Sequence, residues 1–189
     1  MSTQTQRTWT GRVYTTMSLD GFITDPKGDA LWTERLPTDF DHASLRGGRA
    51  ALVWEEFFPG IDAVMLGRLS YERLQHTGRW PFGETPVYVV SRTFPTGDPR
   101  VTGVFRRPED AMAKLNQLGV QSAHVDGGRN IQGFLRRGLI DELTVQIAPV
   151  LLGGGVPLFG LLGQQVNLRV KGTDVTEFGW VRVTYAVQR

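Results

Sequence analysis

Residues 125–143 read VDGGRNIQGFLRRGLIDEL, a sequence that predicts a strand turning through paired glycines into a short helix. The apolar run Ala123-His124-Val125 forms the strand and ends in Asp126-Gly127-Gly128, where the chain can turn sharply. Gly138 ends the helix. Apolar residues spaced i, i+3 and i+4 give this helix one buried face, formed by Ile131, Phe134 and Leu135.

A turn of this kind is a candidate anion-binding site. Backbone N–H groups at the start of a helix have no acceptor within the helix, and they attract anions such as a diphosphate. The alternative is a tight strand-to-helix turn that holds no ligand, because Gly-Gly turns are common. This stretch alone leaves both interpretations open.

The composition limits the possible classes of protein. With 189 residues and 40% hydrophobic content, the chain can bury one substantial core. Its 21 basic and 19 acidic residues give a net charge of +2, too balanced to indicate nucleic acid binding by bulk charge. The absence of cysteine excludes disulfides, cysteine-ligated metals and thiol catalysis. No apolar run approaches the roughly 20 residues of a membrane span, and no signal peptide is evident, so we predict a soluble, cytoplasmic protein.

Two further segments repeat the pattern of a buried strand that ends in small, hydroxyl or basic residues. Ile61–Leu66 is typical of a buried parallel strand, and Gly67–Ser70 leads from it into a helix. Pro86–Val90 is a similar strand, followed by the hydroxyls and arginine of Ser91–Thr93. Arginine can donate two hydrogen bonds to a phosphate, and a helix N-terminus adds its positive end. Each arginine alone indicates only a solvated charge, but three such strand ends together favour a nucleotide site.

The first predicted strand, Arg12–Met17, ends in a motif that contains a further candidate residue. Ser18-Leu19-Asp20-Gly21 places Asp20 beside a glycine at the end of a central strand, where open α/β sheets bind ligands. Asp-Gly is also an ordinary turn, so the residues alone leave a functional and a structural role for Asp20 open.

The remaining segments alternate predicted helices and strands. A helix is predicted over Phe40–Phe58, interrupted at Gly47-Gly48 and better formed over Ala50–Phe58. Another helix begins at Pro108, a residue favoured at the first helical position. Its predicted buried stripe consists of Ala111, Leu115 and Leu118. Further predicted strands are Val101–Phe105, Asp141–Ala148, Val166–Val175 and Gly179–Val187, the last two forming a hairpin.

This succession predicts an α/β fold with a mostly parallel central sheet and an antiparallel C-terminal hairpin. Residues 1–10 are predicted to form a polar tail, and residues 11–189 a single domain.

Five segments, in their order and spacing, give the chain a resemblance to the dihydrofolate-reductase-like family. They are TTMSLDGFIT, DAVMLGRLSYE, VYVVSRT, VDGGRNIQGFL and LIDELTVQIAPVLLGGGVPLF, and the similarity runs from Val13 to Tyr185. The chain is most similar to the branch that includes the reductase domain of bacterial riboflavin biosynthesis. The resemblance implies a three-layer sandwich, in which helices flank the central sheet and NADPH lies across the strand ends.

The resemblance also implies which residues hold the cofactor. Gly67–Ser70 matches the contact with the diphosphate and the 2'-phosphate, and Ser91–Thr93 matches the segment around the adenosine ribose and its 2'-phosphate. Gly127–Ile131 matches a second phosphate-binding turn, and Thr16–Ile23 resembles the loop against the nicotinamide. Because arginine beside hydroxyls suits a 2'-phosphate, NADPH is favoured over NADH. The implied cofactor-binding residues are Thr16, Ile23, Gly67, Arg68, Leu69, Ser70, Ser91, Arg92, Thr93, Gly127, Gly128, Arg129, Asn130 and Ile131.

The implied reaction is hydride transfer to a C=N or C=O bond of a small polar substrate of pyrimidine, pterin or sugar type. Asp20 becomes the candidate catalytic residue, which orients the substrate or a loop or relays a proton. The riboflavin-pathway relative is a 5-amino-6-(5-phosphoribosylamino)uracil reductase that opens a ribose to ribityl by reduction. Its deaminase domain with zinc ligands has no counterpart here. The resemblance therefore implies either a stand-alone pyrimidine reductase or a relative with another substrate.

Other functions are weighed against this one. Folate-reducing members carry an acid shortly before a Phe on the helix ahead of the second strand, whereas the corresponding residues before Phe57 and Phe58 are Val53 and Trp54. This difference disfavours a dihydrofolate reductase, which stays an alternative beside a non-catalytic NADPH-binding or sensor protein. No metal site is predicted, because the three histidines are widely dispersed. They are His42, His76 and His124.

The expected partners are a small-molecule substrate and a second copy of the chain. The basic segments Arg46–Arg49, Arg106-Arg107 and Arg136-Arg137 are short and interspersed with acids, so they indicate solvated faces rather than a nucleic acid site. A homodimer is implied by the resemblance. The apolar segment Leu151–Leu162 could form its contact or could be internal core.

Overall fold

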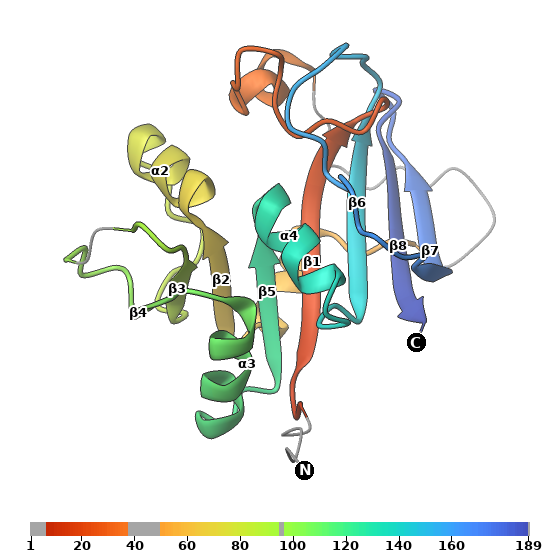
Figure 1. Cartoon of the computed structure of the whole chain (residues 1–189). Coiled ribbons are helices and arrows are strands. Elements are labelled where there is room, and N and C mark those ends of the chain that lie inside the picture. Colours follow the sequence, from red (N-terminus) through yellow and green to blue (C-terminus); the bar gives the residue numbers. More distant parts are fainter. Residues whose placement is uncertain (1–6, 38–49, 95–96, 189) are drawn as a thin grey trace.

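The computed structural model describes residues 7–37, 50–94 and 97–188, which form one 8-stranded sheet with helices on both faces (Figure 1). The strand order is β4-β3-β2-β5-β1-β6-β8-β7. The strands are β1 (Thr10–Ser18), β2 (Ala63–Gly67), β3 (Val87–Val90), β4 (Gly103–Phe105), β5 (Ser122–Asp126), β6 (Glu142–Ala148), β7 (Asn167–Val175) and β8 (Val181–Gln188). The helices are α1 (Trp54–Phe57), α2 (Arg68–Thr77), α3 (Pro108–Gln117) and α4 (Gly128–Leu135), with 3-10 turns η1 (Leu31–Arg35) and η2 (Phe58–Gly60).

The pairing of the strands confirms the predicted sheet. β4, β3, β2, β5, β1 and β6 pair in parallel, and β8 pairs antiparallel with both β6 and β7. The central strands are buried on both faces, which explains why β2 and β3 read as continuous apolar runs rather than as alternating patterns. The edge strand β7 is largely exposed, and its sequence is accordingly more polar than those of β2 and β3.

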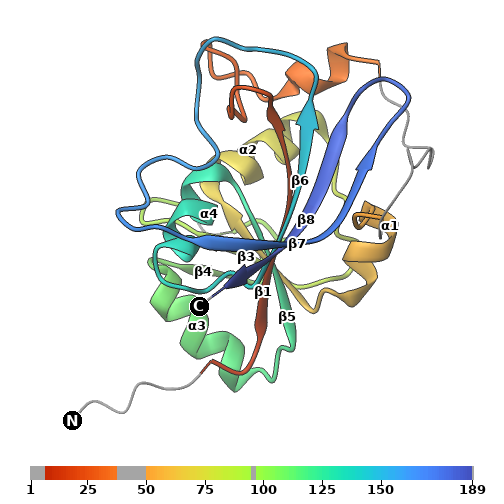
Figure 2. The ribbon, with the colours of Figure 1, turned by 90° about the vertical axis from the view of Figure 1, so that its right-hand side faces the viewer.

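Alternate residues of each central strand face two separate cores. Met65 of β2 packs in a cluster with Leu115 of α3 and Phe134 of α4. Its neighbour Leu66 packs in another cluster with Phe57 of α1 and with residues of α2. Helices α3 and α4 therefore cover one face of the sheet and α1 and α2 the other, and Figure 2 shows α3 and α4 on the side opposite α1. This arrangement confirms the predicted three layers.

The predicted helix over Ala50–Phe58 is wrong over its first half, because α1 spans only Trp54–Phe57. The N–H of Leu52 donates to Oγ1 of Thr184 on β8, at 3.1 Å. Val53 has an extended backbone with φ of −90° and ψ of 164°, so this segment is tied to β8 and is not wound into the helix. The part of that prediction before Ala50 lies outside the described residues.

Leu118 does not belong to the buried stripe of α3, because its side chain is 48% exposed. The helix ends at Gln117, and Gly119 adopts a left-handed conformation with φ of +69°. This turn brings Val120 back into the core, where its N–H donates to the Leu115 carbonyl. The apolar spacing placed Leu118 in the last turn of the helix, but Leu118 is the C-cap residue just before the left-handed glycine that ends it.

Residues 7–10, predicted as part of a polar tail, make contacts with the folded chain. Trp9 is only 3% exposed. The guanidinium of Arg7 pairs with Asp141 at 2.6 Å and also donates to the Leu139 carbonyl. These contacts join the start of β1 to the turn before β6.

The segment Leu151–Leu162 is part core and part surface. Leu158 is fully buried, and Leu162 packs against the core on the side of α3 and α4. Leu151 and Leu161 are 68% and 92% exposed. The interpretation as internal core therefore holds for Leu158 and Leu162, and the dimer contact stays a prediction.

Candidate cofactor-binding site

The centre of the candidate site is the point where β2 and β5 lie side by side. Their register pairs Leu66 with Asp126, so the two strands end at the same level of the sheet. β2 leads into α2 on one face, and β5 leads into α4 on the opposite face. Neighbouring parallel strands whose helices leave to opposite faces form the crevice in which open α/β sheets bind ligands.

Glycines allow the two strand-to-helix turns to approach each other closely. Gly127 has φ of +93°, and a Cβ atom added there would lie 2.7 Å from the Ser70 Oγ and 3.5 Å from the Gly67 Cα. A Cβ added to Gly128 would lie 2.5 Å from the Cδ1 of Ile23. The structure thus brings five of the predicted residues into direct proximity. A side chain at Gly127 would crowd the turn between β2 and α2, and one at Gly128 would crowd Ile23.

Both helices begin without a side-chain cap. Gly67 and Gly127 are the N-cap residues of α2 and α4, and neither end has a capping hydrogen bond from a side chain. The Gly127 N–H donates to the side-chain carboxylate of Asp126, at 2.7 Å. The Gly128, Arg129 and Asn130 N–H groups have no acceptor among the described residues. Two uncapped N-termini side by side provide the donors and the positive potential that suit a diphosphate.

Two of the predicted contact residues are turned into the protein instead. The Asn130 amide donates to the carbonyls of Met65 and Asp126, at 2.9 and 3.2 Å. It therefore ties α4 to both β2 and β5. Ile131 is fully buried in the core, and its N–H donates to the Gly127 carbonyl. These residues hold the shape of the turn, while the exposed side chain of Arg129 projects from it.

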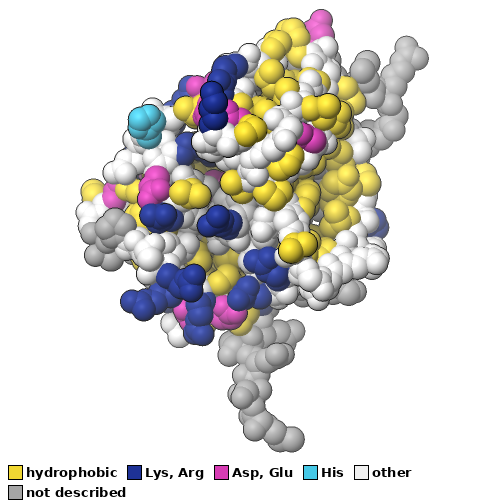
Figure 3. Space-filling view, turned by 45° about the horizontal axis from the view of Figure 1, so that its top comes forward, with side chains coloured by type: hydrophobic (Ala, Val, Ile, Leu, Met, Phe, Trp, Pro, Cys, Tyr) yellow, Lys and Arg dark blue, Asp and Glu magenta, His cyan; other side chains and the backbone are white. Residues whose placement is uncertain are grey.

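The third predicted segment lies one strand further along the same edge. Gly67 pairs with Val90, the residue before Ser91, and the Ser91 N–H donates to the carbonyl of Phe105 on β4. Arg92 and Arg129 are exposed and have no carboxylate within ion-pair distance among the described residues. Figure 3 brings this edge towards the viewer and shows Lys and Arg side chains gathered on one half of the face.

Arg68 and Leu69 occupy the exposed first turn of α2. Arg68 pairs with Glu72 of the same helix at 3.4 Å, an arrangement in which both side chains are nearly half exposed. Such surface pairs contribute little, so Arg68 can leave Glu72 for a phosphate. Leu69 is 57% exposed beside it.

The segment after β1 closes one side of the site together with the loop after β6. Asp20 accepts hydrogen bonds from Ser18 Oγ at 2.5 Å, from the Leu152 N–H at 3.1 Å and from the Gly153 N–H at 2.8 Å. Ile23 donates its N–H to Val156 and rests against Gly128. These bonds place Asp20 as the clamp between the two loops. These contacts fit a residue that orients a loop, and a catalytic role for Asp20 stays a prediction.

The hydrogen bond from Ser18, assisted by the Gly153 and Leu152 amides, lowers the pKa of Asp20 below its usual value of 3.8. The clamp therefore stays charged at neutral pH. We expect Asp20→Asn to increase hydrogen exchange at the Leu152 and Gly153 amides about fivefold or more, because charged acceptors bind amides more strongly than neutral ones. Exchange measured by NMR tests this.

Asp25 provides a matched control for Asp20. Its carboxylate accepts from the N–H groups of Lys27 and Asp29 in an ordinary turn. Asp25→Asn should leave exchange at Leu152 and Gly153 unchanged. Equal exchange at those amides in the native chain and in Asp20→Asn would contradict the clamp.

The sequence pattern of the RibD C-terminal domain family matches residues 10–181 of the chain. The chain belongs to this family. The match covers every element from β1 to the start of β8. It therefore includes the three strand ends assigned to the cofactor, Gly67–Ser70, Ser91–Thr93 and Gly127–Ile131.

Relatives of this RibD C-terminal domain protein agree with the assignment. A putative riboflavin biosynthesis protein of Shewanella sp. PV-4 has a solved structure that is 30% identical, with a TM-score of 0.81 over 95% of this chain and 99% of that one. The uncharacterized protein YwjB of Bacillus subtilis is 29% identical over 88% of this chain and 91% of its own length. The riboflavin biosynthesis protein RibD of Corynebacterium ammoniagenes is 24% identical over 83% of this chain but only 47% of its own length.

Some residues that shape the site in this RibD-type fold carry no local sequence signal. The Gln132 amide donates to the carbonyls of Pro157 and Leu158, and Thr24 Oγ1 accepts from the Val156 N–H. Gln132 fastens the loop after β6 to α4, and Thr24 fastens it to the segment after β1. Their partners are far away in the sequence, so no spacing rule could have identified them.

The structure shows the position of His124, one of the three dispersed histidines. His124 is fully buried, which lowers its pKa, and it packs edge-on against Trp54 and Phe57. Among residues 7–37, 50–94 and 97–188, no three potential ligands gather in a way that could hold a metal ion. None of the helices within those ranges has the length and apolar character to span a bilayer. His42 and Arg46–Arg49 lie outside the described residues.

Two arginine pairs predicted as solvated faces are exposed, one just before α3 and one just after α4. Arg107 pairs with Asp110 at 2.8 Å, and Arg137 pairs with Glu109. Arg136 donates to the Leu161 carbonyl at 2.9 Å.

Proposed function

We propose that the chain is an NADPH-dependent reductase that delivers hydride to a C=N or C=O bond of a small polar substrate. The observation that carries the proposal is the meeting of two uncapped helix N-termini at the crevice between β2 and β5. Membership of the RibD C-terminal domain family supports the same conclusion. A stand-alone pyrimidine reductase is one form of this activity, and a relative with another substrate is the other.

Each part of the site has a separate task in this proposal. The amides of Gly128–Asn130 and the first turn of α2 bind the diphosphate. Arg68 and the segment Ser91–Thr93 bind the 2'-phosphate, because arginine beside hydroxyls selects a phosphorylated ribose. The segment Thr16–Ile23 orients the nicotinamide, which supplies the hydride when it is bound. Asp20 acts through the loop after β6 by holding it closed beside α4.

A non-catalytic NADPH-binding protein is the second candidate, since the same residues would bind NADPH in it. NADPH oxidation with any member of a panel of pyrimidine, pterin and sugar substrates excludes that alternative. We also propose a homodimer, which the two exposed leucines Leu151 and Leu161 support.

Titration of the chain with NADPH and NADH tests the cofactor assignment. We expect NADPH to bind more tightly, and we expect Arg68→Ala to remove about 1–3 kcal/mol of that preference, the scale of a hydrogen bond to a charged group. Ser91→Ala should reduce the preference by a smaller amount, because a hydroxyl is neutral. Isothermal titration calorimetry measures both.

Arg79→Ala is the matched control, since Arg79 follows the other end of α2 and pairs with exposed Glu34 at 2.6 Å. It should leave both affinities unchanged. Equal affinity of the native chain for NADPH and NADH would count against the 2'-phosphate contacts as assigned.

A further inference from the structure

The segment Ser91–Thr93, assigned above to the 2'-phosphate, has few contacts of its own. The Ser91 N–H donates to the Phe105 carbonyl, and the Thr93 N–H donates to the Ser91 hydroxyl at 3.2 Å. In the part of the chain that the structure describes, no hydrogen bond or ion pair joins this segment to α2, which carries Arg68. Two parts of a protein that bind one phosphate need a fixed distance between them. Another contact must therefore set this distance.

The side chain of Tyr71 makes such a contact from α2. Tyr71 lies three residues after Arg68, so the two are neighbours on the surface of the helix. Its ring packs edge-on against Phe94, with the ring centroids 4.7 Å apart. Phe94 directly follows Thr93 in the chain. The contact thus joins the start of α2 to the end of the segment assigned to the 2'-phosphate.

The Tyr71 hydroxyl extends this connection to the loop between β3 and β4. It donates to the carboxylate of Asp98. Asp98 also accepts from Nε and Nη2 of Arg100, at 3.1 and 2.8 Å. The Arg100 guanidinium in turn lies over the ring of Trp80, which follows α2, at 4.8 Å from the ring centroid. We call Tyr71, Asp98 and Arg100 the loop anchor, because they fasten this loop to α2.

The loop anchor keeps its hydrogen bonds and its charge balance at neutral pH. The hydrogen bonds from Arg100 and Tyr71 hold the pKa of Asp98 well below its usual value of 3.8. Burial and the adjoining carboxylate raise the pKa of Tyr71 above its usual value of 10.0. Tyr71 therefore stays a donor and Asp98 a charged acceptor, a combination stronger than a hydrogen bond between neutral groups. Arg100 balances the charge of Asp98.

The anchor bridges a space that is not filled by packing. An open cavity of about 530 Å³ lies between α2 and the loop. Its lining includes Tyr71 and Gln75 of α2 and Phe94, Asp98 and Arg100 of the loop. A loop held across a cavity is positioned by a small number of contacts, so the loss of one contact changes its position or its mobility.

We propose that Tyr71 and Asp98 are positioning residues that hold Ser91–Thr93 at the distance from Arg68 that a 2'-phosphate requires. The inference rests on the proposed NADPH-dependent function, and it adds a determinant of cofactor specificity that does not itself touch the cofactor. NADH lacks the 2'-phosphate. A loosened anchor therefore weakens the binding of NADPH and spares that of NADH, because only the former needs both parts of the site in place.

Isothermal titration calorimetry of the full chain with NADPH and NADH tests the inference. Tyr71→Phe removes the hydroxyl and keeps the ring. We expect it to lower the ratio of NADPH to NADH affinity about fivefold, the effect of one hydrogen bond, with the affinity for NADH unchanged. Asp98→Asn should lower the same ratio, and it decides the matter if Tyr71→Phe does not fold.

A double-mutant cycle with Arg68→Ala shows whether the anchor acts through the 2'-phosphate contact. In the Arg68→Ala background, Tyr71→Phe should change the ratio by about twofold or less, because the contact that it positions is already missing. An equal fivefold effect in both backgrounds would overturn the link to Arg68.

Tyr88→Phe is the matched control. Tyr88 lies buried on β3, the strand that leads to Ser91, and its ring stacks on Phe105 with centroids 5.2 Å apart. The described residues give its hydroxyl no hydrogen bond, so this variant should keep the native ratio. The inference is overturned if folded Tyr71→Phe also keeps that ratio, or if it binds both cofactors equally more weakly. Equal affinity of the native chain for NADPH and NADH would instead overturn the assigned 2'-phosphate contacts on which the inference rests.

Discussion

The Gly127→Ala variant is expected to bind NADPH about 10- to 100-fold more weakly than the native chain, which corresponds to about 1.4–2.7 kcal/mol. The backbone at Gly127 has φ of +93° and ψ of 126°, a conformation that alanine adopts only with strain. The new methyl group would also lie 2.7 Å from the Ser70 Oγ. Relief of this contact moves the N-terminus of α4 away from that of α2, and the two ends then no longer bind one diphosphate together.

Gly138→Ala separates this effect from backbone strain. Gly138 follows the other end of α4, has φ of +63° and has open space around its Cα. The substitution should destabilise the fold by about 1 kcal/mol and leave the affinity for NADPH unchanged. Both affinities are measured by fluorescence titration, with stability followed by chemical denaturation. If Gly127→Ala binds NADPH as tightly as the native chain, the paired N-termini of α2 and α4 do not form the diphosphate site.

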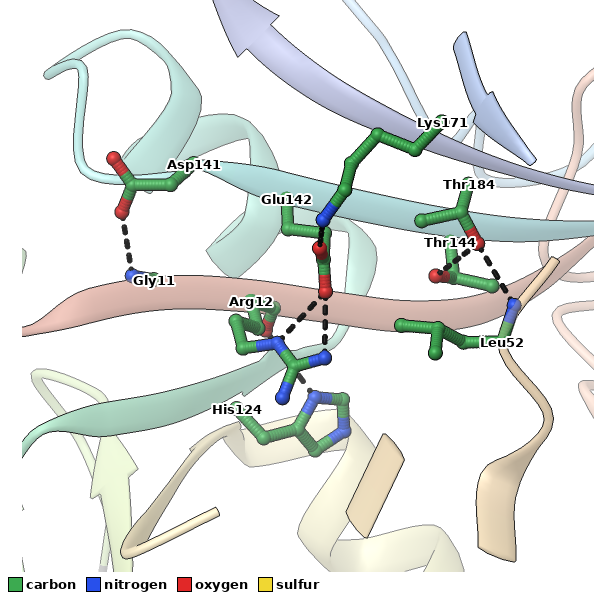
Figure 4. A network of polar contacts seen from close by, with 9 residues as sticks. All are labelled: Gly11, Arg12, Leu52, His124, Asp141, Glu142, Thr144, Lys171 and Thr184. Atoms are coloured by element: carbon green, nitrogen blue, oxygen red, sulfur yellow. Dashed lines mark hydrogen bonds and ion pairs between the residues drawn. The ribbon is translucent and has the colours of Figure 1, made fainter. Parts of the chain in front are cut away.

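Glu142→Gln is expected to lower the free energy of unfolding by roughly 3 kcal/mol, the scale for removing one partner from a buried ion pair. The Glu142 side chain is 10% exposed, and it accepts from Arg12 at 2.6 and 2.8 Å and from Lys171 (Figure 4). Without the carboxylate, the cations of Arg12 on β1 and Lys171 on β7 have no negative charge between them. Urea denaturation measures the loss.

The effect of Glu142 should depend on pH in a defined direction. Burial alone would raise its pKa, but the hydrogen bonds from Lys171 and Arg12 outweigh burial and hold the pKa below its usual value of 4.5. The contribution of Glu142 is therefore complete above about pH 4.5 and is lost as the pH falls through the lower pKa of the folded state. The difference between the native chain and Glu142→Gln should be constant near neutral pH and should shrink in acid.

Glu109→Gln is the matched control, because it removes the same carboxylate charge from an exposed ion pair. Glu109 pairs with Arg137 on the surface, where its side chain is 47% exposed. Exposed pairs contribute below about 1 kcal/mol, so this variant should remain close to native stability. A loss for Glu142→Gln no larger than for Glu109→Gln would show that the buried network contributes little.

The parts of the fold that depend on local pattern could be predicted from the residues. The apolar run of β2, the glycines that follow β2 and β5, and the stripe Ile131–Leu135 of α4 act within a few neighbouring residues, and the structure confirms each element. One failure has a distant cause, because the N–H of Leu52 donates to Thr184 on β8 and the segment before α1 is not helical. The other is local, because the turn at Gly119 leaves Leu118 exposed to solvent.

The residue types at the strand ends of the candidate cofactor site could be predicted, but their side-chain contacts could not. Gly67, Ser70, Gly127 and Gly128 converge as the hypothesis requires. That Asn130 bonds to Met65 and that Asp20 holds Gly153 depend on partners from other elements, which no spacing rule reveals. The role of each residue in binding stays a prediction for the titrations above.

The amino-acid sequence was sufficient for the order of strands and helices, the parallel core with its C-terminal hairpin, and the glycine and arginine strand ends. Hydrophobic period, turn residues and capping signals act locally, so they can be recognised without coordinates. The tertiary structure alone determined that β2 lies beside β5 and that Thr16, Gln146, Arg182 and Asp174 align across four strands. Strand neighbours and register arise from burial of the whole sheet, in which a shift by one residue would turn each side chain to the other face.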